Sequence, residues 1–272
     1  MKPVLLIGAG RMGGGLLNGW IRADIHPLIV VDPNPSAQVR KVARAHQVQI
    51  LKTIEYFCVR ARACVIAIKP QVFKNDATSF AGVAQSGALM ISIAAGTSTN
   101  FMRDAWGREA RIIRAMPNMP GSIGRGISAL YAAPTATVAD RKFAQRLLAA
   151  LGETIWLQKE SLIDSVTAVS GSGPAYVFLL AEALAEAAQA EGLSRDVAER
   201  LARATVSGAG ALLDGDKRPV VALRRDVTSP GGTTEAALQV LTSEGALKAL
   251  IARAVRAARR RAEELASWGT SR

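Results

Sequence analysis

Cysteine and histidine are scarce in this 272-residue chain. The two cysteines, Cys58 and Cys64, lie in one segment, which excludes a disulfide framework and the spacing of a structural zinc site. The two histidines, His26 and His46, belong to no motif, and the sequence has no cluster of metal-ligating side chains. We therefore expect no metal ion. Both thiols are expected to be buried or idle in a reducing cytoplasm.

Aromatic residues and long hydrophobic runs are also rare. Aromatics make up 5% of the chain, so alanine, valine, leucine and isoleucine must fill the core. No uninterrupted apolar stretch reaches the ~18 residues of a transmembrane helix. The apolar run from Val4 to Ile7 is shorter than the ~7–15 residues of an export signal. These features predict a cytoplasmic protein without a membrane partner.

The charge balance is basic, with 34 lysines and arginines against 22 acidic residues. Such an excess is compatible with nucleic-acid binding. However, the arginines are spread along the chain, and the densest group, Arg256 with Arg259–Arg261, lies in a helical pattern beside Glu263 and Glu264. That pattern is typical of a solvated helix face. We expect no nucleic-acid partner, although a positive field would attract an anionic substrate or a phosphate-bearing cofactor.

Up to about residue 160, strand-like and helix-like segments alternate. This alternation predicts a parallel sheet with helices on both faces, as in a Rossmann-type doubly wound α/β domain over residues 1–160. The expected strands span residues 3–7, 28–31, 64–68, 88–94, 111–115, 126–132 and 154–157, and the first two helices span 12–23 and 36–46.

After residue 160 no strand signal remains. Pro174 suits the first position of a helix over 174–191, and Ser194 can cap the next one over 195–213. Two further helical stretches follow at about 233–243 and 246–266. Residues 161–272 are therefore predicted to form an all-helical domain.

A glycine-rich turn follows the first predicted strand. The segment Gly8-Ala9-Gly10-Arg11-Met12-Gly13 matches G-x-G-x-x-G and lies between a strand and a helix. In that context the first glycine permits a tight turn, the second lets a pyrophosphate approach the backbone, and the third allows close helix–strand packing. The sequence thus predicts a dinucleotide site, with NADH or NADPH as the cofactor.

Asp32 ends the second predicted strand. A carboxylate there commonly accepts hydrogen bonds from the adenosine ribose and repels a 2′-phosphate, which favours NADH. The alternative is an aspartate that merely initiates the turn before Pro33. Arg40 is close enough in sequence to bear on this choice. Two later strand ends, one with Ala67, Lys69 and Pro70 and one with Ala95, are expected at the same edge of the sheet.

A second informative segment, Val227–Glu235, precedes the helix expected at 233–243. Its hydroxyls and glycines would leave backbone N–H groups directed outward, which suits a small carboxylate. A plain helix cap explains the same residues equally well.

Several segments together resemble the pyrroline-5-carboxylate reductase family. The resemblance extends from about residue 4 to about residue 266, and its specific part is DVTSPGGTT at 226–234, with Leu223 upstream. The other segments are GAGRMG at 8–13, AIKPQ at 67–71, RAMPN at 114–118 and SGSGPAY at 170–176.

The resemblance implies reduction of 1-pyrroline-5-carboxylate to proline, the last step of proline biosynthesis, with NAD(P)H. It implies that Thr234 faces the reacting imine nitrogen, while the loop from Ser229, chiefly the N–H groups of Gly231, Gly232 and Thr233, holds the substrate carboxylate. Ala67, Lys69 and Ala95 would line the nicotinamide nucleotide, with Met116 and Asn118 nearby.

The resemblance also implies an interlocked homodimer, in some relatives assembled further. The Ala-rich C-terminal helices fit such self-association. The chain departs from the family pattern at two places. The family commonly has a glutamate shortly before the proline that corresponds to Pro219, whereas this chain has only Asp214 and Asp216 there. Family members typically have serine or asparagine where this chain has Asp32.

The sequence gives less support to other functions. A dehydrogenase of the β-hydroxyacid or 6-phosphogluconate type would carry a lysine on the helix expected at 174–191, and none is present. A non-catalytic NAD(P) sensor would not require the intact 226–234 segment.

Overall fold

The computed structural model describes residues 1–54 and 60–267. Cys58 lies outside these ranges, whereas Cys64 is buried. Within the described residues the chain divides into two compact units, one formed by residues 1–172 with the chain from 258 onward, and the other by Gly173–Ala257. This division falls later than the boundary at 160 that the sequence suggests.

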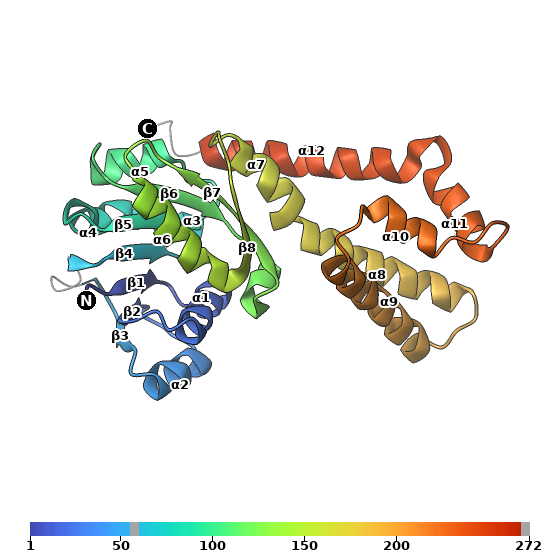
Figure 1. The fold of residues 1–272 in the computed structure, drawn as a ribbon, viewed down its shortest axis with the longest axis horizontal. Coiled ribbons are helices and arrows are strands. Elements are labelled where there is room, and N and C mark those ends of the chain that lie inside the picture. The colour runs from blue at the N-terminus through green and yellow to red at the C-terminus, as the bar shows by residue number, and fades with distance from the viewer. Residues whose placement is uncertain (55–59, 268–272) are drawn as a thin grey trace. The chain divides into compact units, whose positions relative to one another are not determined.

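The first unit is built on a sheet that has eight strands among the described residues, in the order β3-β2-β1-β4-β5-β6-β7-β8 (Figure 1). β1 to β6 run parallel to one another. The strands are β1 (Val4–Ile7), β2 (Leu28–Val31), β3 (Gln49–Leu51), β4 (Ala63–Ile66), β5 (Leu89–Ser92), β6 (Ile112–Met116), β7 (Gly126–Ala132) and β8 (Gly152–Trp156).

The expectation of a parallel sheet is wrong at one edge, because β7 pairs antiparallel with β6. A parallel connection needs a crossover of a dozen or more residues. Only a short segment containing the 3₁₀ turn Met119–Ile123 separates β6 from β7, so β7 must return alongside β6. The short strand β3 was also not expected from the sequence.

Two hydrophobic clusters lie on opposite faces of the sheet. Alternate residues of β1 divide between them, with Val4 and Leu6 in one cluster and Leu5 and Ile7 in the other. This is the expected result for a strand buried on both faces. The first cluster includes residues of α1 (Arg11–Arg22), α2 (Ala37–Ala45) and α6 (Val138–Leu148), and the second includes residues of α3 (Pro70–Asp76), α4 (Ala81–Gln85) and α5 (Thr99–Trp106).

Within the described residues no strand follows β8, as the sequence predicts. The second unit contains α8 (Gly173–Ala190), α9 (Arg195–Gly215), α10 (Val220–Asp226), α11 (Thr233–Thr242) and most of α12 (Ala246–Ser267). The sequence pattern missed α10 and the short helix α7 (Leu162–Val166) of the first unit, which have seven and five residues. Helices this short give little periodic signal.

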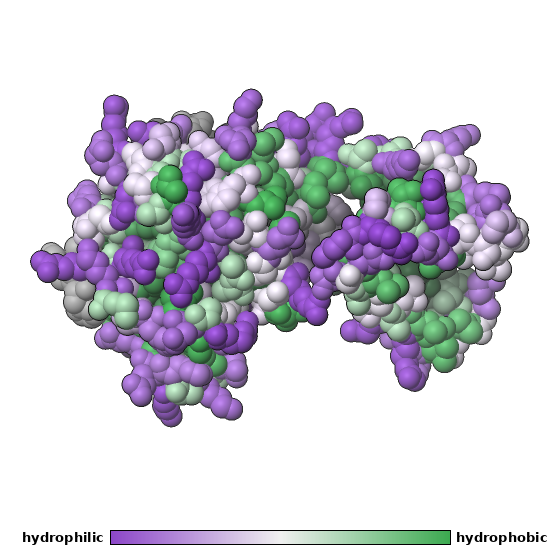
Figure 2. Space-filling model, viewed as in Figure 1, coloured by the Kyte–Doolittle hydropathy of each residue, from purple (hydrophilic) through white to green (hydrophobic). Residues whose placement is uncertain are grey.

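The helical unit exposes many large apolar side chains, and Figure 2 shows hydrophobic residues on its surface. On α8, the side chains of Phe178 and Leu179 are 65% and 62% exposed. The continuous helical run Leu162–Ala190 is long and apolar enough to cross a membrane by length and composition, and little of it is buried within the chain. A helix face that packs on a second chain gives the same pattern, so this observation alone is weak evidence for a membrane span.

Candidate cofactor and substrate sites

The glycine turn joins β1 to α1, and its three glycines meet different constraints. Gly8 has φ +86°, and a Cβ there would lie 2.6 Å from Ile68 Cγ2. A Cβ on Gly13 would lie 2.1 Å from the carbonyl oxygen of Gly8, so only glycine fits at this helix–strand contact. A Cβ on Gly10, in contrast, would have no heavy atom within 4 Å. The protein itself therefore does not require glycine at position 10, whereas a ligand approaching the backbone would.

Gly10 is also the N-cap of α1 and provides no capping side chain. The first N–H groups of the helix consequently lack an intrahelical or capping partner and can bind an anion. Of the next two residues, Arg11 is exposed, while Met12 packs against the hydrophobic core. Met12 can therefore contribute its backbone, but not its side chain, to a bound pyrophosphate. These features fit a dinucleotide phosphate group.

Asp32 follows β2 directly and is half-buried. One carboxylate oxygen, Oδ2, accepts a hydrogen bond of 2.8 Å from the N–H of Ala9 in the glycine turn. The other, Oδ1, accepts one of 2.8 Å from the N–H of Asn34, which is the turn-initiating geometry. An ionised carboxylate has about four lone-pair sites, so these two bonds leave capacity for a ribose hydroxyl.

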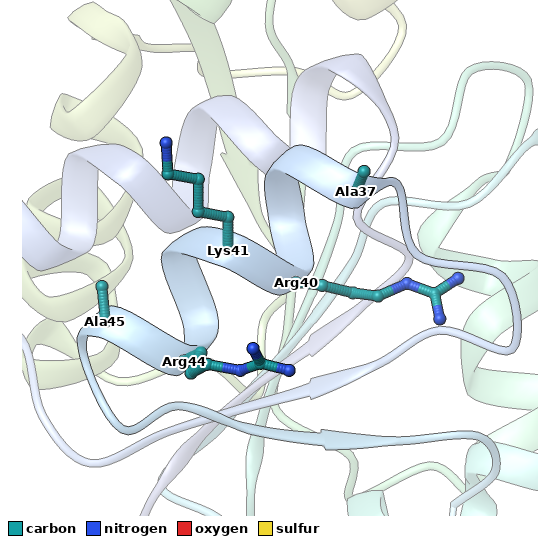
Figure 3. Close-up of a pocket in the computed structure, with 5 residues that line it drawn as sticks. All are labelled: Ala37, Arg40, Lys41, Arg44 and Ala45. Atoms are coloured by element: carbon teal, nitrogen blue, oxygen red, sulfur yellow. The ribbon is translucent and has the colours of Figure 1, made fainter.

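Basic side chains surround the same strand end. A cavity is lined by Asp32, Arg40, Arg44 and Lys52. Figure 3 draws a second cavity that shares Arg40 and Arg44 with the first, and it shows these two side chains extending in a similar direction from α2, with Lys41 on another side. Arg40 is held by a 3.0 Å hydrogen bond from its Nε to the carbonyl oxygen of Pro35. This cavity thus combines the carboxylate that disfavours a 2′-phosphate with cations that favour one.

The remaining predicted cofactor residues follow strands that are neighbours in the sheet. Ala67 follows β4, and its N–H donates to Ile7 at 2.8 Å. Lys69 is the N-cap of α3 and Pro70 its first residue, while Ala95 follows β5. Because parallel strands end at one edge, these residues share the edge that carries the glycine turn.

Two more predicted residues lie where β6 ends. Met116 is the last residue of that strand. Asn118 is the N-cap of the following 3₁₀ turn, and its Oδ1 accepts a 2.9 Å hydrogen bond from the N–H of Ile127. The Asn118 side chain therefore helps to fix the β6–β7 connection.

In the second unit, the segment Val227–Gly232 leads into α11. Gly231 has φ +70°, a conformation that favours glycine. Its N–H donates to Glu235 Oε2 at 2.7 Å, and the N–H of Gly232 donates to the carbonyl oxygen of Ser229 at 3.0 Å. Two of the three amides expected to hold a carboxylate thus donate within the loop.

The third amide, that of Thr233, belongs to the first turn of α11, together with that of Thr234. N–H groups in the first turn of a helix have no intrahelical acceptor. An anion at this position would therefore accept hydrogen bonds first from the N–H groups of Thr233 and Thr234. To accept one from the N–H of Gly231, it would have to displace the Glu235 carboxylate.

The comparisons with known proteins agree with this arrangement. A family model described as "Pyrroline-5-carboxylate reductase dimerisation" matches residues 160–265. The pyrroline-5-carboxylate reductase of Pseudomonas aeruginosa is 37% identical over 97% of this chain and 96% of its own length. The chain belongs to the pyrroline-5-carboxylate reductase family.

Other relatives support the assignment to this family of oxidoreductases. The Arabidopsis thaliana pyrroline-5-carboxylate reductase is 34% identical over 95% of this chain and 94% of its own. Among solved structures, the Coxiella burnetii pyrroline-5-carboxylate reductase has a TM-score of 0.89 at 35% identity, covering 96% of this chain and 97% of its own. The Plasmodium falciparum pyrroline carboxylate reductase with NADP bound has a TM-score of 0.81 at 27% identity, covering 98% of each chain.

The N-terminal region has a match of its own. A model described as "NADP oxidoreductase coenzyme F420-dependent" covers residues 3–96, which include the glycine turn and Asp32. The chain is therefore an NAD(P)-dependent oxidoreductase of the pyrroline-5-carboxylate reductase family.

The family pattern places an acid before Pro219, and Asp216 is a candidate for that position. Its carboxylate, however, is already paired with an arginine. Arg218 donates to Asp216 Oδ2 at 2.8 Å and to Asp226 Oδ2 at 2.7 Å. The Arg218 side chain, and secondarily its backbone N–H, hold the pKa of Asp216 below its usual value. Asp216 is therefore the carboxylate partner of Arg218 in an ion pair. Over the described ranges, no three His, Cys, Asp or Glu side chains are grouped so that they could hold a metal ion.

The sequence reasoning missed one buried group near the cofactor edge. Arg114 on β6 is 4% exposed and pairs with Glu160 and Asp164. In the sequence Arg114 stands out only as part of the RAMPN segment, because a single arginine in an apolar strand carries no motif signal.

Proposed function

We propose that this protein reduces 1-pyrroline-5-carboxylate to proline with NAD(P)H, the last step of proline biosynthesis. The observation that carries this proposal is the similarity to pyrroline-5-carboxylate reductases over nearly the whole chain, combined with an open glycine turn at the N-terminus of α1.

The residues present suit hydride transfer to a cyclic imine. When bound, the nicotinamide supplies the hydride, and the protein contributes orientation and electrostatics. Gly10 and the first turn of α1 would bind the pyrophosphate, and Ala67, Lys69 and Ala95 would line the nucleotide. The first turn of α11 would bind the substrate carboxylate. Thr234 would hydrogen-bond the ring nitrogen, whose basicity removes the need for a strong general acid.

The direct test is to follow NAD(P)H oxidation with pyrroline-5-carboxylate beside a panel of 2-keto acids, and NAD(P)+ reduction with a panel of 3-hydroxy acids. We expect turnover with pyrroline-5-carboxylate only, with proline as the product. Turnover of a 2-keto or 3-hydroxy acid in place of the imine would overturn the proposal and favour another dehydrogenase class.

The cofactor preference is a further proposal. We expect NADH to be favoured, because the Asp32 carboxylate would lie beside a 2′-phosphate. Asp32→Ser should raise the ratio of kcat/KM for NADPH to that for NADH about tenfold, which corresponds to about 1.4 kcal/mol. Arg40→Gln should lower the same ratio, because Arg40 lines the cavity that contains Asp32. If Asp32→Ser leaves this ratio unchanged, Asp32 does not contribute to the choice between NADH and NADPH.

Glu235 offers a test of the carboxylate site. Its side chain occupies the amide of Gly231, so a negative charge already lies where the substrate carboxylate is proposed to bind. Glu235→Gln keeps an acceptor for that N–H and removes the charge. We expect KM for pyrroline-5-carboxylate to fall about two- to fivefold with kcat unchanged, the effect of one solvent-exposed charge interaction of ~0.5–1 kcal/mol. A rise in KM would show that the Glu235 charge supports the site.

We also propose a homodimer, or a higher assembly of such dimers, formed through the apolar surface of the helical unit. The dimerisation model at 160–265 and the exposure of Phe178 and Leu179 support this. Light scattering should give twice the chain mass or a higher even multiple, and a monomer would contradict it.

A cytoplasmic location without a membrane or nucleic-acid partner remains part of the proposal. The arginine cluster on α12 supports the last point, since Arg259 pairs with Glu263 at 2.8 Å and Arg261 with Glu264 at 2.7 Å.

A further inference from the structure

Arg114 is a charged residue inside β6, two positions before Met116, and it is 4% exposed. Its Nη1 lies 3.0 Å from Glu160 Oε1, and its Nη2 lies 3.6 Å from Asp164 Oδ1. Removing such a group from water is costly, and a buried ion pair often stabilises a fold no more than apolar residues of similar size would. Fold stability alone is therefore a weak explanation for an arginine at this position.

Glu160 connects Arg114 to the loop that follows β5. Its Oε1 accepts a 2.7 Å hydrogen bond from the N–H of Thr99, and its Oε2 accepts a 2.5 Å bond from Thr99 Oγ1. Thr99 is the first residue of α5, directly after the loop 94–98 that contains Ala95. Glu160 thus fixes the end of this loop, and Arg114 fixes Glu160.

Asp164 connects Arg114 to the segment that packs on Met116. Asp164 lies in α7, and the chain continues from there to Gly171. A Cβ on Gly171 would lie 3.0 Å from Met116 Cε, so backbone and methionine are in close contact. Burial raises the pKa of Asp164, and the charge of Arg114 opposes this rise. Arg114 is therefore the larger of two arginine charges, with Arg259, that favour the ionised form of Asp164.

The two connections converge on one part of the sheet edge. The loop with Ala95 and the strand end with Met116 belong to neighbouring strands, β5 and β6. Ala95 is proposed to line the nicotinamide nucleotide, and Met116 is expected near it. The loop is also restrained from another side, because a Cβ on Gly96 would lie 3.2 Å from the carbonyl oxygen of Leu265. Arg114 pairs both with Glu160, which holds the end of the loop, and with Asp164, which lies in the segment that leads to Gly171 and its contact with Met116.

We propose that Arg114 is a positioning residue for hydride transfer, which through Glu160 and Asp164 fixes the loop 94–98 and Met116 against the nicotinamide end of the cofactor. It does not touch the reacting atoms. The inference rests on the proposed function for its effect on turnover, but its effect on cofactor binding does not depend on the substrate.

The test compares Arg114→Met with Arg111→Met. Arg111 immediately precedes β6 at the opposite end of the strand, and it pairs with the buried Asp140 at 2.7 Å. It thus provides an arginine–carboxylate pair away from the cofactor edge, in which the carboxylate is the more buried partner, with Arg111 35% and Asp140 7% exposed. For each variant, the Tm, the Kd for NADH, the Kd for ADP and kcat are measured. ADP reports the adenosine diphosphate half of the site alone.

We expect Arg114→Met to weaken NADH binding and to lower kcat tenfold to a hundredfold, because small displacements of an orienting group have effects of this order. Its Kd for ADP should stay within about twofold of the wild type, and Arg114→Lys should recover part of kcat. Arg111→Met should lower the Tm and leave both Kd values and kcat within about twofold. Equal effects of Arg114→Met and Arg111→Met on kcat, or an unchanged Kd for NADH in Arg114→Met, would overturn the proposal.

If Arg114→Met does not fold, Thr99→Val carries the test, since it removes only the hydroxyl that donates to Glu160. It should weaken NADH binding about threefold or more without changing ADP binding, and no change would overturn the inference. The binding measurements need no substrate. A wild type that binds NADH but does not reduce pyrroline-5-carboxylate would therefore contradict the proposed function and still leave the inference tested.

Discussion

A Gly10→Val variant should fold like the wild type and lose at least about a hundredfold in affinity for NAD(P)H. Gly10 has φ −65° and ψ −160°, so it lies outside the left-handed region that favours glycine, and a Cβ there would have no neighbour within 4 Å. The loss would come from the side chain holding the pyrophosphate away from the N-terminus of α1. Two charge-assisted hydrogen bonds of ~1.5–3 kcal/mol each are enough for this effect. NADH titration followed by fluorescence measures it, and thermal unfolding tests the fold.

Gly13→Ala is the contrasting variant. Its Cβ would lie 2.1 Å from the Gly8 carbonyl oxygen, so the turn or the helix must shift. We expect a destabilisation of roughly 1–3 kcal/mol together with weaker cofactor binding. If Gly10→Val lowers the Tm as Gly13→Ala does, or binds NADH like the wild type, the glycine turn is not the pyrophosphate site.

Thr234→Ala is expected to lower kcat/KM for pyrroline-5-carboxylate about tenfold to a hundredfold. A neutral hydrogen bond contributes roughly 0.5–1.5 kcal/mol and a charge-assisted one roughly 1.5–3, which together span this range. The Kd for NADH should stay nearly constant, because Thr234 is proposed to contact only the imine. Thr242→Ala is a suitable control. That hydroxyl, at the other end of α11, donates to the carbonyl oxygen of Leu238 at 2.7 Å.

The size of the Thr234 effect separates two mechanisms. A general acid on which proton transfer depended would cost about 100- to 10,000-fold, whereas an orienting hydroxyl costs less. A change confined to KM would instead place Thr234 among the groups that hold the carboxylate. Wild-type values of both parameters would show that Thr234 is not the catalytic residue.

Much of the fold could be predicted because its signals are local. The expected helices at 12–23 and 36–46 correspond to α1 and α2, and the apolar run 28–31 is β2. Ser36 caps α2 by accepting from the N–H of Val39, the kind of interaction that a sequence displays directly. The candidate site was predictable to the same degree, since Gly8, Gly10 and Gly13 carry the glycine turn within six residues.

Other features depend on how segments fold back on one another and not on a motif within one segment. That β7 runs against β6 follows from the short connection after Met116, which no single segment signals. The cavity that places Arg40 and Lys52 beside Asp32 required α2 and β3 to pack against the end of β2. Glu235 reaches Gly231 only once the loop before α11 has formed.

The sequence by itself determined the class of fold, the glycine turn and the family, because periodicity and short motifs are properties of neighbouring residues. Only the tertiary structure decided the surroundings of Arg114, which lies 46 residues from Glu160 in the chain and 15 residues from Thr99. A buried arginine requires acceptors, and the acceptors that meet it are brought together by strand order and helix packing. Such a partnership leaves no periodic trace along the chain, so it becomes visible only after folding.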